Sequence, residues 1–203
     1  MSKKDLLAEI EDKKELYGYQ KGDIDKIFER LDNAPHNYHL LYQLPTGGGK
    51  TVIFSEITRR YLEQHNKKVV VLTHRIELCK QTSKMLKAFD VKNKVINSAI
   101  KELPDQEEYS CFVAMIETLK NRLNDEKLEI QDVGLVIIDE AHFNSFRKLF
   151  SAFENAFILG VTATPLSSNI KLPMHQSYDE LIVGDTIGSL IENGFLAKAV
   201  TYS

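Results

Sequence analysis

This chain of 203 residues has little cysteine, no long apolar run and no excess of basic charge. Its two cysteines, Cys79 and Cys111, form no Cys-x-x-Cys pair and no metal-ligand spacing, which suits a reducing cytosol. The six histidines show no ligand spacing either, so zinc is not expected. Apolar runs such as 133–138 are far shorter than the roughly 20 residues that span a bilayer, and residues 1–14 are too charged for a signal peptide. We therefore expect a cytoplasmic protein without a membrane span.

The formal net charge of −3 argues against a protein that binds nucleic acid over its whole surface. Basic residues gather between positions 67 and 94, where Lys80, Lys84 and Lys87 lie on one face of an expected helix. Most lysine faces of this kind are solvated, and we expect the same for these three.

The hydrophobic content of 43% is enough for one domain with one core. Short apolar runs alternate along the chain with segments of helical periodicity. Strands are expected at 39–44, 68–73, 94–98, 110–114, 133–139 and 157–162, helices at 20–31, 50–64, 75–89, 117–123 and 186–193, a helix or turn at 146–153, and a mobile loop at 167–176. This alternation predicts an α/β fold, with a mostly parallel sheet covered by helices on both faces.

The most informative segment is Gln43-Leu44-Pro45-Thr46-Gly47-Gly48-Gly49-Lys50-Thr51, between an expected strand and an expected helix. Glycines allow consecutive backbone N–H groups to turn inward around phosphates, and the helix that follows directs its positive end at them. Lys50 can reach the β- and γ-phosphates of a nucleotide, and the Thr51 hydroxyl can bind Mg²⁺. The first position of the general G-x-x-x-x-G-K-[ST] pattern is Leu44 instead of Gly. An ordinary glycine-rich turn is the alternative, which the flanking strand and helix disfavour.

A second signal is the run Leu-Val-Ile-Ile-Asp-Glu-Ala-His at 135–142, a buried strand that ends in two carboxylates. Ligands of a parallel sheet bind beyond the carboxyl ends of its strands, so these acids should lie beside the phosphate loop. We assign Asp139 to Mg²⁺ and Glu140 to the attacking water. A third strand leads into Thr162-Ala163-Thr164-Pro165. Either acid alone would be typical of a solvated strand end, but the three runs together favour catalysis.

With these motifs the chain resembles the superfamily 2 helicases and translocases, in particular their XPB-like and RadD-like branch. The segments 45–51, 139–142 and 162–165 match motifs I, II and III, and residues 70–78 with Gln81 look like motif Ia. Leu16-Tyr17-Gly18-Tyr19-Gln20 looks like the L-R-x-Y-Q base motif of this branch, in which the phosphate loop usually lacks its leading Gly. The resemblance covers residues 16–202.

The resemblance implies a RecA-like ATP hydrolase in which Lys50 and Glu140 are catalytic and Mg²⁺ binds to Thr51 and Asp139. The residues implied in ATP binding are Tyr17, Gln20, Pro45, Thr46, Gly47, Gly48, Gly49, Lys50 and Thr51. Tyr17 stands where the family has Arg, and either side chain can cover an adenine face. Gln20 has the donor and acceptor that suit the adenine edge, whereas Tyr19 is expected only to pack.

The resemblance further implies that His142, Thr162 and Thr164 couple the γ-phosphate site to the nucleic acid and to a second lobe. Arg75 and Thr118 stand where the family contacts the phosphodiester backbone. For Thr118, a role at a helix N-cap is at least equally open.

Superfamily 2 motors hydrolyse ATP between two RecA-like lobes, and the second lobe carries an arginine finger in a Q-x-x-G-R-x-G-R motif. No glycine in this sequence is followed by Arg. We therefore expect a helical extension at 1–15 and the first lobe at 16–203, as part of a longer protein that binds DNA in preference to RNA; a natural stand-alone lobe remains open. Two alternative functions are the motor segment of a restriction-endonuclease subunit and a non-catalytic, nucleotide-dependent binding module.

Overall fold

The computed structural model describes residues 15–35, 37–97, 106–124, 130–166 and 173–197. They form a seven-stranded sheet in the order β3-β4-β2-β5-β6-β1-β7, in which every neighbouring pair is parallel. The strands are β1 (His39–Gln43), β2 (Lys68–Thr73), β3 (Asn93–Ile96), β4 (Cys111–Met115), β5 (Val133–Asp139), β6 (Phe157–Thr162) and β7 (Glu180–Val183). The helices are α2 (Gly18–Asn33), α3 (Lys50–Gln64), α4 (Ile76–Ala88), α5 (Ile116–Asn124), α6 (Ile187–Glu192) and the 3₁₀ helices η1 (Asn144–Phe153) and η2 (Met174–Gln176). The expected α/β fold with a parallel sheet is confirmed.

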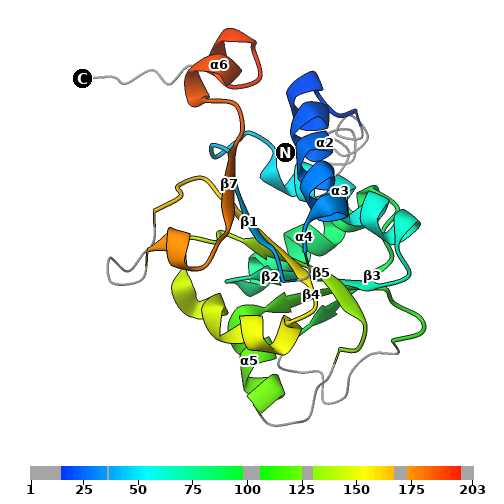
Figure 1. Ribbon diagram of the computed structural model, residues 1–203. Helices are drawn as coiled ribbons and strands as arrows, with labels where there is room; N and C mark the ends of the chain where they lie inside the picture. The colour runs from blue at the N-terminus through cyan, green and yellow to red at the C-terminus, as the bar shows by residue number, and fades with distance from the viewer. Residues whose placement is uncertain (1–14, 36, 98–105, 125–129, 167–172, 198–203) are drawn as a thin grey trace.

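Helices cover both faces of the sheet, as expected (Figure 1). One core lies under α2, α3 and α4, where Ile27, Ile57 and Leu86 pack against β1 and β2. The other lies under α5 and η1, where Leu119 and Phe146 pack against β4 and β5. Because both faces are covered, the central strands are apolar at nearly every position instead of alternating, which is the pattern by which the sequence reveals them.

The six expected strands agree with the structure to within two residues at each end. The seventh, β7, is missing from the sequence-based prediction. It lies at the edge of the sheet, pairs only with β1 in the described part of the chain, and leaves Leu181 and Val183 largely exposed. Its apolar run is only three residues long, 181–183, which is shorter than the runs of about 4–8 residues by which a buried strand is recognised.

The expected helical extension at 1–15 lies outside the described residues but for Glu15. Of the expected loop at 167–176, residues 167–172 also lie outside them, while 174–176 form η2. The helix or turn expected at 146–153 is a 3₁₀ helix that starts at Asn144. Where the chain is described, no helix has both the length and the apolarity needed to cross a membrane.

The carboxyl ends of the central strands are level with one another. Gln43 of β1 is in register with Thr162 of β6, and Val161 is in register with Asp139 of β5. On the other side, Thr73 of β2 is in register with Met115 of β4. The loops that carry the candidate site residues therefore leave the sheet at one edge.

Candidate nucleotide-binding site

The phosphate loop has the backbone of an anion-binding cradle. Gly47 and Gly49 have φ angles of 84° and 81°, in the left-handed region that favours glycine. A Cβ on Gly48 would lie 2.8 Å from Cγ of Leu44, and its N–H donates to the Pro45 carbonyl at 3.0 Å. Gly49 is the N-cap of α3, so the first N–H groups of this helix lie at the loop, where they favour an anion.

Lys50 extends into this loop. Its Nζ donates to the carbonyl oxygens of Leu44, at 3.1 Å, and Pro45, at 3.3 Å. Burial lowers the pKa of the ammonium group, and the nearby charges of Glu140 and Asp139 oppose that shift. The cation is therefore held between backbone carbonyls and close to both acids.

Asp139 is only 8% exposed at the end of β5. Burial raises the pKa of its carboxyl group to about 6, and the charge of Glu140 adds to the shift, whereas Lys50 and the Glu140 N–H oppose it. That N–H donates to Oδ1 of Asp139 at 3.1 Å. Carboxylate and hydroxyl oxygens such as those of Asp139 and Thr51 are the kind of ligand that Mg²⁺ prefers.

Glu140 has a φ of 57°, a conformation that is strained for a residue with a side chain. The turn is closed by the Phe143 N–H, which donates to the Glu140 carbonyl at 3.2 Å. This left-handed residue turns the chain directly after Asp139, the last residue of β5.

Hydrogen bonds connect the three residues that are predicted to couple the γ-phosphate site to a second lobe: His142 contacts Thr162, and Thr162 contacts Thr164. His142 Nδ1 lies 3.1 Å from Thr162 Oγ1 and 3.3 Å from Glu140 Oε2. The Thr162 hydroxyl donates to the Thr164 carbonyl at 2.8 Å and accepts from the Thr164 N–H at 3.2 Å. Because the Thr162 hydroxyl gives its one proton to the Thr164 carbonyl, His142 donates from Nδ1 to Thr162. Hydrogen bonds thus join His142 to the loop after β6, and the Glu140 carboxylate lies beside the same imidazole nitrogen.

The base motif lies against the phosphate loop. Gln20 is only 3% exposed, and its Nε2 would lie 2.5 Å from a Cβ on Gly49. Its Oε1 accepts from the Tyr17 N–H at 3.0 Å, and its Nε2 lies 3.4 Å from the Tyr19 hydroxyl. Tyr19 packs on the core as expected, but its hydroxyl also donates to the Gly48 carbonyl at 2.8 Å, a contact with the loop that the sequence analysis missed. The position of Tyr19 within the base motif is the sequence feature that could have indicated this contact.

The sequence analysis also missed His74 and Phe143. Burial lowers the pKa of the His74 imidazole, and the nearby backbone and carboxylate of Glu140 oppose that shift. The Phe143 ring lies between two imidazoles, with centroids 4.4 Å from His74 and 4.2 Å from His142. The turn after β2 is therefore packed directly against the acidic loop, and no spacing in the sequence indicates it.

The two candidate nucleic-acid contacts follow the adjacent strands β2 and β4. Arg75 is the exposed N-cap residue of α4, and its carbonyl accepts from the Thr73 hydroxyl at 3.1 Å. Thr118 is the third residue of α5, partly buried, so it does not occupy the N-cap position that was left open. Lys80, Lys84 and Lys87 are exposed, as expected.

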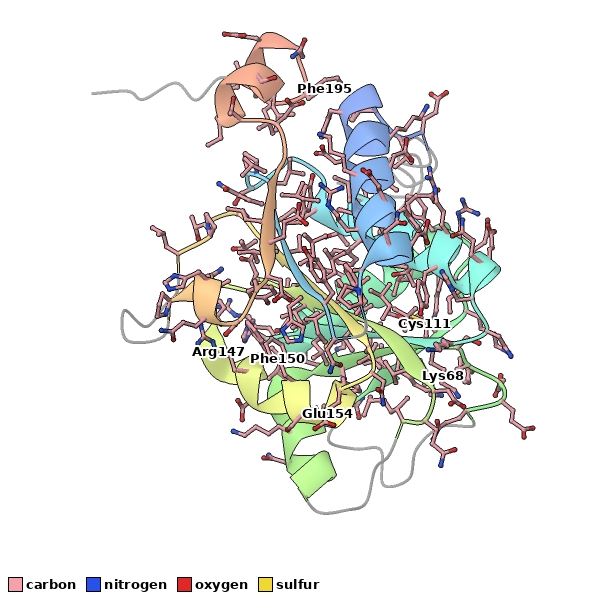
Figure 2. The ribbon with its side chains drawn as sticks, viewed as in Figure 1. Lys68, Cys111, Arg147, Phe150, Glu154 and Phe195 are labelled. Carbon is pink, nitrogen blue, oxygen red and sulfur yellow. The ribbon has the colours of Figure 1, made fainter. Side chains whose placement is uncertain are left out.

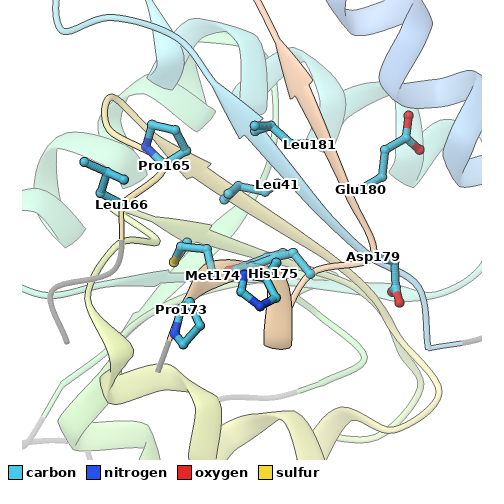
Figure 3. Close-up of a pocket in the computed structure, with 10 residues that line it drawn as sticks. Leu41, Pro165, Leu166, Pro173, Met174, His175, Asp179, Glu180 and Leu181 are labelled. Atoms are coloured by element: carbon cyan, nitrogen blue, oxygen red, sulfur yellow. The ribbon is translucent and has the colours of Figure 1, made fainter. Parts of the chain in front are cut away.

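Two hollows flank this edge of the sheet. One, of about 520 Å³, is lined by Pro45, Thr46, Thr164 and residues 183–188, and so opens at the phosphate loop. The other, of about 590 Å³, is apolar and lies between β7, η2 and Pro165 (Figure 3). No phosphate-loop residue lines this second hollow, so the hollow at Pro45 and Thr46 is the better candidate for the nucleotide.

Comparison with known families and sequences gives a consistent result. The family described as "Type III restriction enzyme, res subunit" matches residues 13–167. IRC3 of Saccharomyces cerevisiae, which carries the name of an ATP-dependent helicase, is 33% identical over 199 residues, which cover 91% of this chain and 28% of IRC3. QP509L of African swine fever virus (strain Badajoz 1971 Vero-adapted), named as an ATP-dependent RNA helicase, is 30% identical over 156 residues, which cover 74% of this chain and 29% of QP509L. The chain thus spans less than a third of the length of either relative.

Solved structures share the fold. The Hef helicase domain of Pyrococcus furiosus superposes with a TM-score of 0.62 at 22% identity, over 79% of this chain and 37% of Hef. The UvsW helicase of bacteriophage T4 gives 0.64 at 20% identity, over 82% and 59%. The type ISP restriction-modification enzyme LlaGI, in complex with a DNA substrate mimic, gives 0.64 at 17% identity, over 89% and 21%. At these identities the likeness concerns the fold alone.

Because the pKa of Asp139 is raised, the ionised carboxylate should make the folded protein less stable at neutral pH. The folded state holds the proton up to a pH of about 6, against 3.8 for a free Asp, so this group makes the protein less stable as the pH rises from about 4 to about 6. Asp139→Asn should therefore raise the free energy of unfolding at pH 7.5 by roughly 1–3 kcal/mol, and the gain should vanish below about pH 4. Urea unfolding at several pH values measures this.

The exposed Asp32→Asn serves as the control and should change stability little at any of these pH values. A loss of stability in Asp139→Asn at pH 7.5, or a gain that does not depend on pH, would contradict the interpretation of this site.

Proposed function

We propose that this chain, which belongs to the type III restriction enzyme res subunit family and is the first RecA-like lobe of a superfamily 2 helicase, binds ATP with Mg²⁺ for a motor that moves along DNA. The observation that carries the proposal is the juxtaposition of Lys50, inside a glycine loop, with Asp139 and Glu140. A cradle of N–H groups, one partly buried cation and two acids make up the set of groups that phosphoryl transfer requires.

The residues present fit a triphosphate. The loop takes glycines where a Cβ would meet neighbouring atoms, so backbone N–H groups can approach an anion closely. The backbone carbonyls around Lys50 Nζ are weak partners for an ammonium, and phosphate oxygens would satisfy it better. Thr51 and Asp139 would hold Mg²⁺, which neutralises phosphate charge when bound.

The proposed division of labour follows from these positions. Lys50 holds the β- and γ-phosphates and stabilises the charge that develops on them. Glu140 orients the attacking water and accepts its proton, and the strained turn and His142 keep its carboxylate in place. His142 and Thr162 then link the state of Glu140 to the loop that ends at Thr164, which faces a second lobe in our proposal.

The choice of DNA is part of the proposal. The description of the family and the DNA-bound LlaGI structure favour it, whereas QP509L is named as an RNA helicase. The alternative, that this chain is the motor segment of a restriction enzyme, is consistent with the same comparisons. In that case the whole protein would also carry a nuclease domain. A non-catalytic binding module is disfavoured because Lys50, Asp139 and Glu140 are all present.

The binding roles of three side chains can be separated by calorimetric titration of this chain with Mg²⁺-ATP. Lys50→Ala should weaken binding by at least about tenfold, because it removes a charge-assisted hydrogen bond. Glu140→Gln should bind with nearly unchanged affinity, since Glu140 acts on the water. Gln20→Ala should lose preference for ATP over GTP. If Glu140→Gln lost binding as completely as Lys50→Ala, our assignment of Glu140 would be wrong.

Turnover by residues 1–203 alone should be slow and little stimulated by DNA or RNA. An arginine finger is worth roughly 10³–10⁵ in rate, and no glycine-arginine pair of the expected motif is present in this sequence. A phosphate-release assay with and without nucleic acid measures this, and the whole protein, or the second lobe supplied in trans, should restore the rate. Robust hydrolysis by this chain alone, stimulated by nucleic acid, would contradict the proposal that a second lobe is needed for turnover.

Nucleic-acid binding by the whole protein should depend on Arg75. Arg75→Ala should weaken binding equally for unrelated sequences and lower the salt slope of log K by about 1, because one phosphate contact is lost. Fluorescence anisotropy over a series of salt concentrations measures both. Lys84→Ala, on the exposed lysine face, is the matched control and should behave as wild type. Unchanged binding by Arg75→Ala would contradict the assignment.

A further inference from the structure

We infer that Phe195 belongs to the nucleotide site, where its ring and that of Tyr17 form a joint aromatic surface on which the base of bound ATP stacks. The inference rests on the proposed function and deepens it. The base motif assigns Tyr17 and Gln20 to the nucleotide, and nothing in that motif assigns Phe195, which comes from the opposite end of the described chain.

Three rings make up this aromatic cluster. The Phe195 centroid lies 4.6 Å from that of Tyr17 and 5.0 Å from that of Tyr19, at interplanar angles of 46° and 53°. The rings of Tyr17 and Tyr19 are 6.0 Å apart and nearly parallel, at 15°. Figure 2 shows Phe195 between α6 and the first turn of α2. These are the distances at which aromatic side chains attract one another.

The backbone holds Phe195 firmly in this place. Gly194 has a φ of 76° and ends α6 with a reversal of the chain. The N–H groups of Phe195 and Leu196 then both donate to the Leu190 carbonyl, at 2.8 and 3.0 Å. This segment, 194–196, is a helix-terminating turn with a defined geometry, and it aims Phe195 at the base motif.

The same turn contacts the phosphate loop. A Cβ on Gly47 would lie 2.8 Å from Cδ2 of Leu196, so Leu196 lies against the loop next to Phe195. On the other side, the Tyr19 hydroxyl donates to the Gly48 carbonyl at 2.8 Å. The aromatic cluster is therefore fixed to the loop at two points, and a base attached to a triphosphate in that loop lies within its reach.

The cluster is exposed although it is aromatic. Tyr17 is 52% exposed and Phe195 is 36% exposed, so a large part of both residues remains open to solvent. The rings of Tyr17 and Phe195 touch, whereas a base between them would need about 7 Å, twice the carbon–carbon contact distance. The base thus stacks on the open side of the joint surface, and Phe195 both enlarges this surface and fixes the orientation of Tyr17.

Titration calorimetry of this chain with Mg²⁺-ATP and with Mg²⁺-tripolyphosphate tests the inference, because tripolyphosphate has no base. Phe195→Ala should weaken ATP binding by roughly five- to a hundredfold, the range of base–aromatic stacking, and leave tripolyphosphate binding unchanged. Phe195→Leu, which keeps apolar packing on the tyrosines, should show the same loss, and Phe195→Tyr should restore the affinity. Leu181→Ala, an exposed apolar residue on β7, is the control and should bind both ligands as wild type.

Unchanged or tighter ATP binding by Phe195→Ala would overturn the inference, since the ring would then be a bystander or a cover over the site. An equal loss for ATP and tripolyphosphate in Phe195→Leu would also overturn it, because the residue would then act on the phosphate loop. If wild type bound neither ligand, the proposed function itself would fail, which is a different result from either of these.

Discussion

The attraction between the partly buried ammonium of Lys50 and the carboxylates of Asp139 and Glu140, at the end of a parallel sheet, is the interaction around which the site is built. Burial lowers the pKa of Lys50 and raises that of Asp139, and each charge makes the other less costly to bury. The parallel sheet makes this arrangement possible because the ends of β1, β6 and β5 are level. Side chains far apart in the sequence therefore meet at one edge, where a nucleotide binds in folds of this kind.

Several features of this edge lower stability in favour of chemistry. Asp139 is buried next to Glu140, Glu140 has a left-handed backbone, and the hydrogen bonds of Lys50 within the described residues go to backbone carbonyls. A ligand that brings negative phosphates and a divalent cation would compensate the charges of Lys50 and of the two acids. The hydrogen bond between His142 and Thr162 ties the acidic turn to the neighbouring strand β6, and the Glu140 carboxylate lies 3.3 Å from the same imidazole nitrogen.

Local chemistry explains what could be predicted from the sequence. Strands such as β5 and β6 are covered on both faces, so their apolar runs are unmistakable, and the glycines before Lys50 follow from backbone conformation alone. What could not be predicted depends on contacts between distant segments. The edge strand β7 has an apolar run of only three residues and is defined by its pairing with β1. The hydrogen bond from Tyr19 to Gly48 joins two motifs, and Phe195 reaches Tyr17 because Gly194 turns the chain back. Thr118 was open between two roles, and its position inside α5 removes the N-cap role.

The most direct test of the central claim is a crystal structure of this chain with Mg²⁺ and a non-hydrolysable ATP analogue. The account predicts that Lys50 Nζ leaves the carbonyls of Leu44 and Pro45 for phosphate oxygens, and that the cation lies between Thr51 and Asp139. A triphosphate bound elsewhere, or bound in the loop while Lys50 keeps both carbonyl contacts, would contradict it.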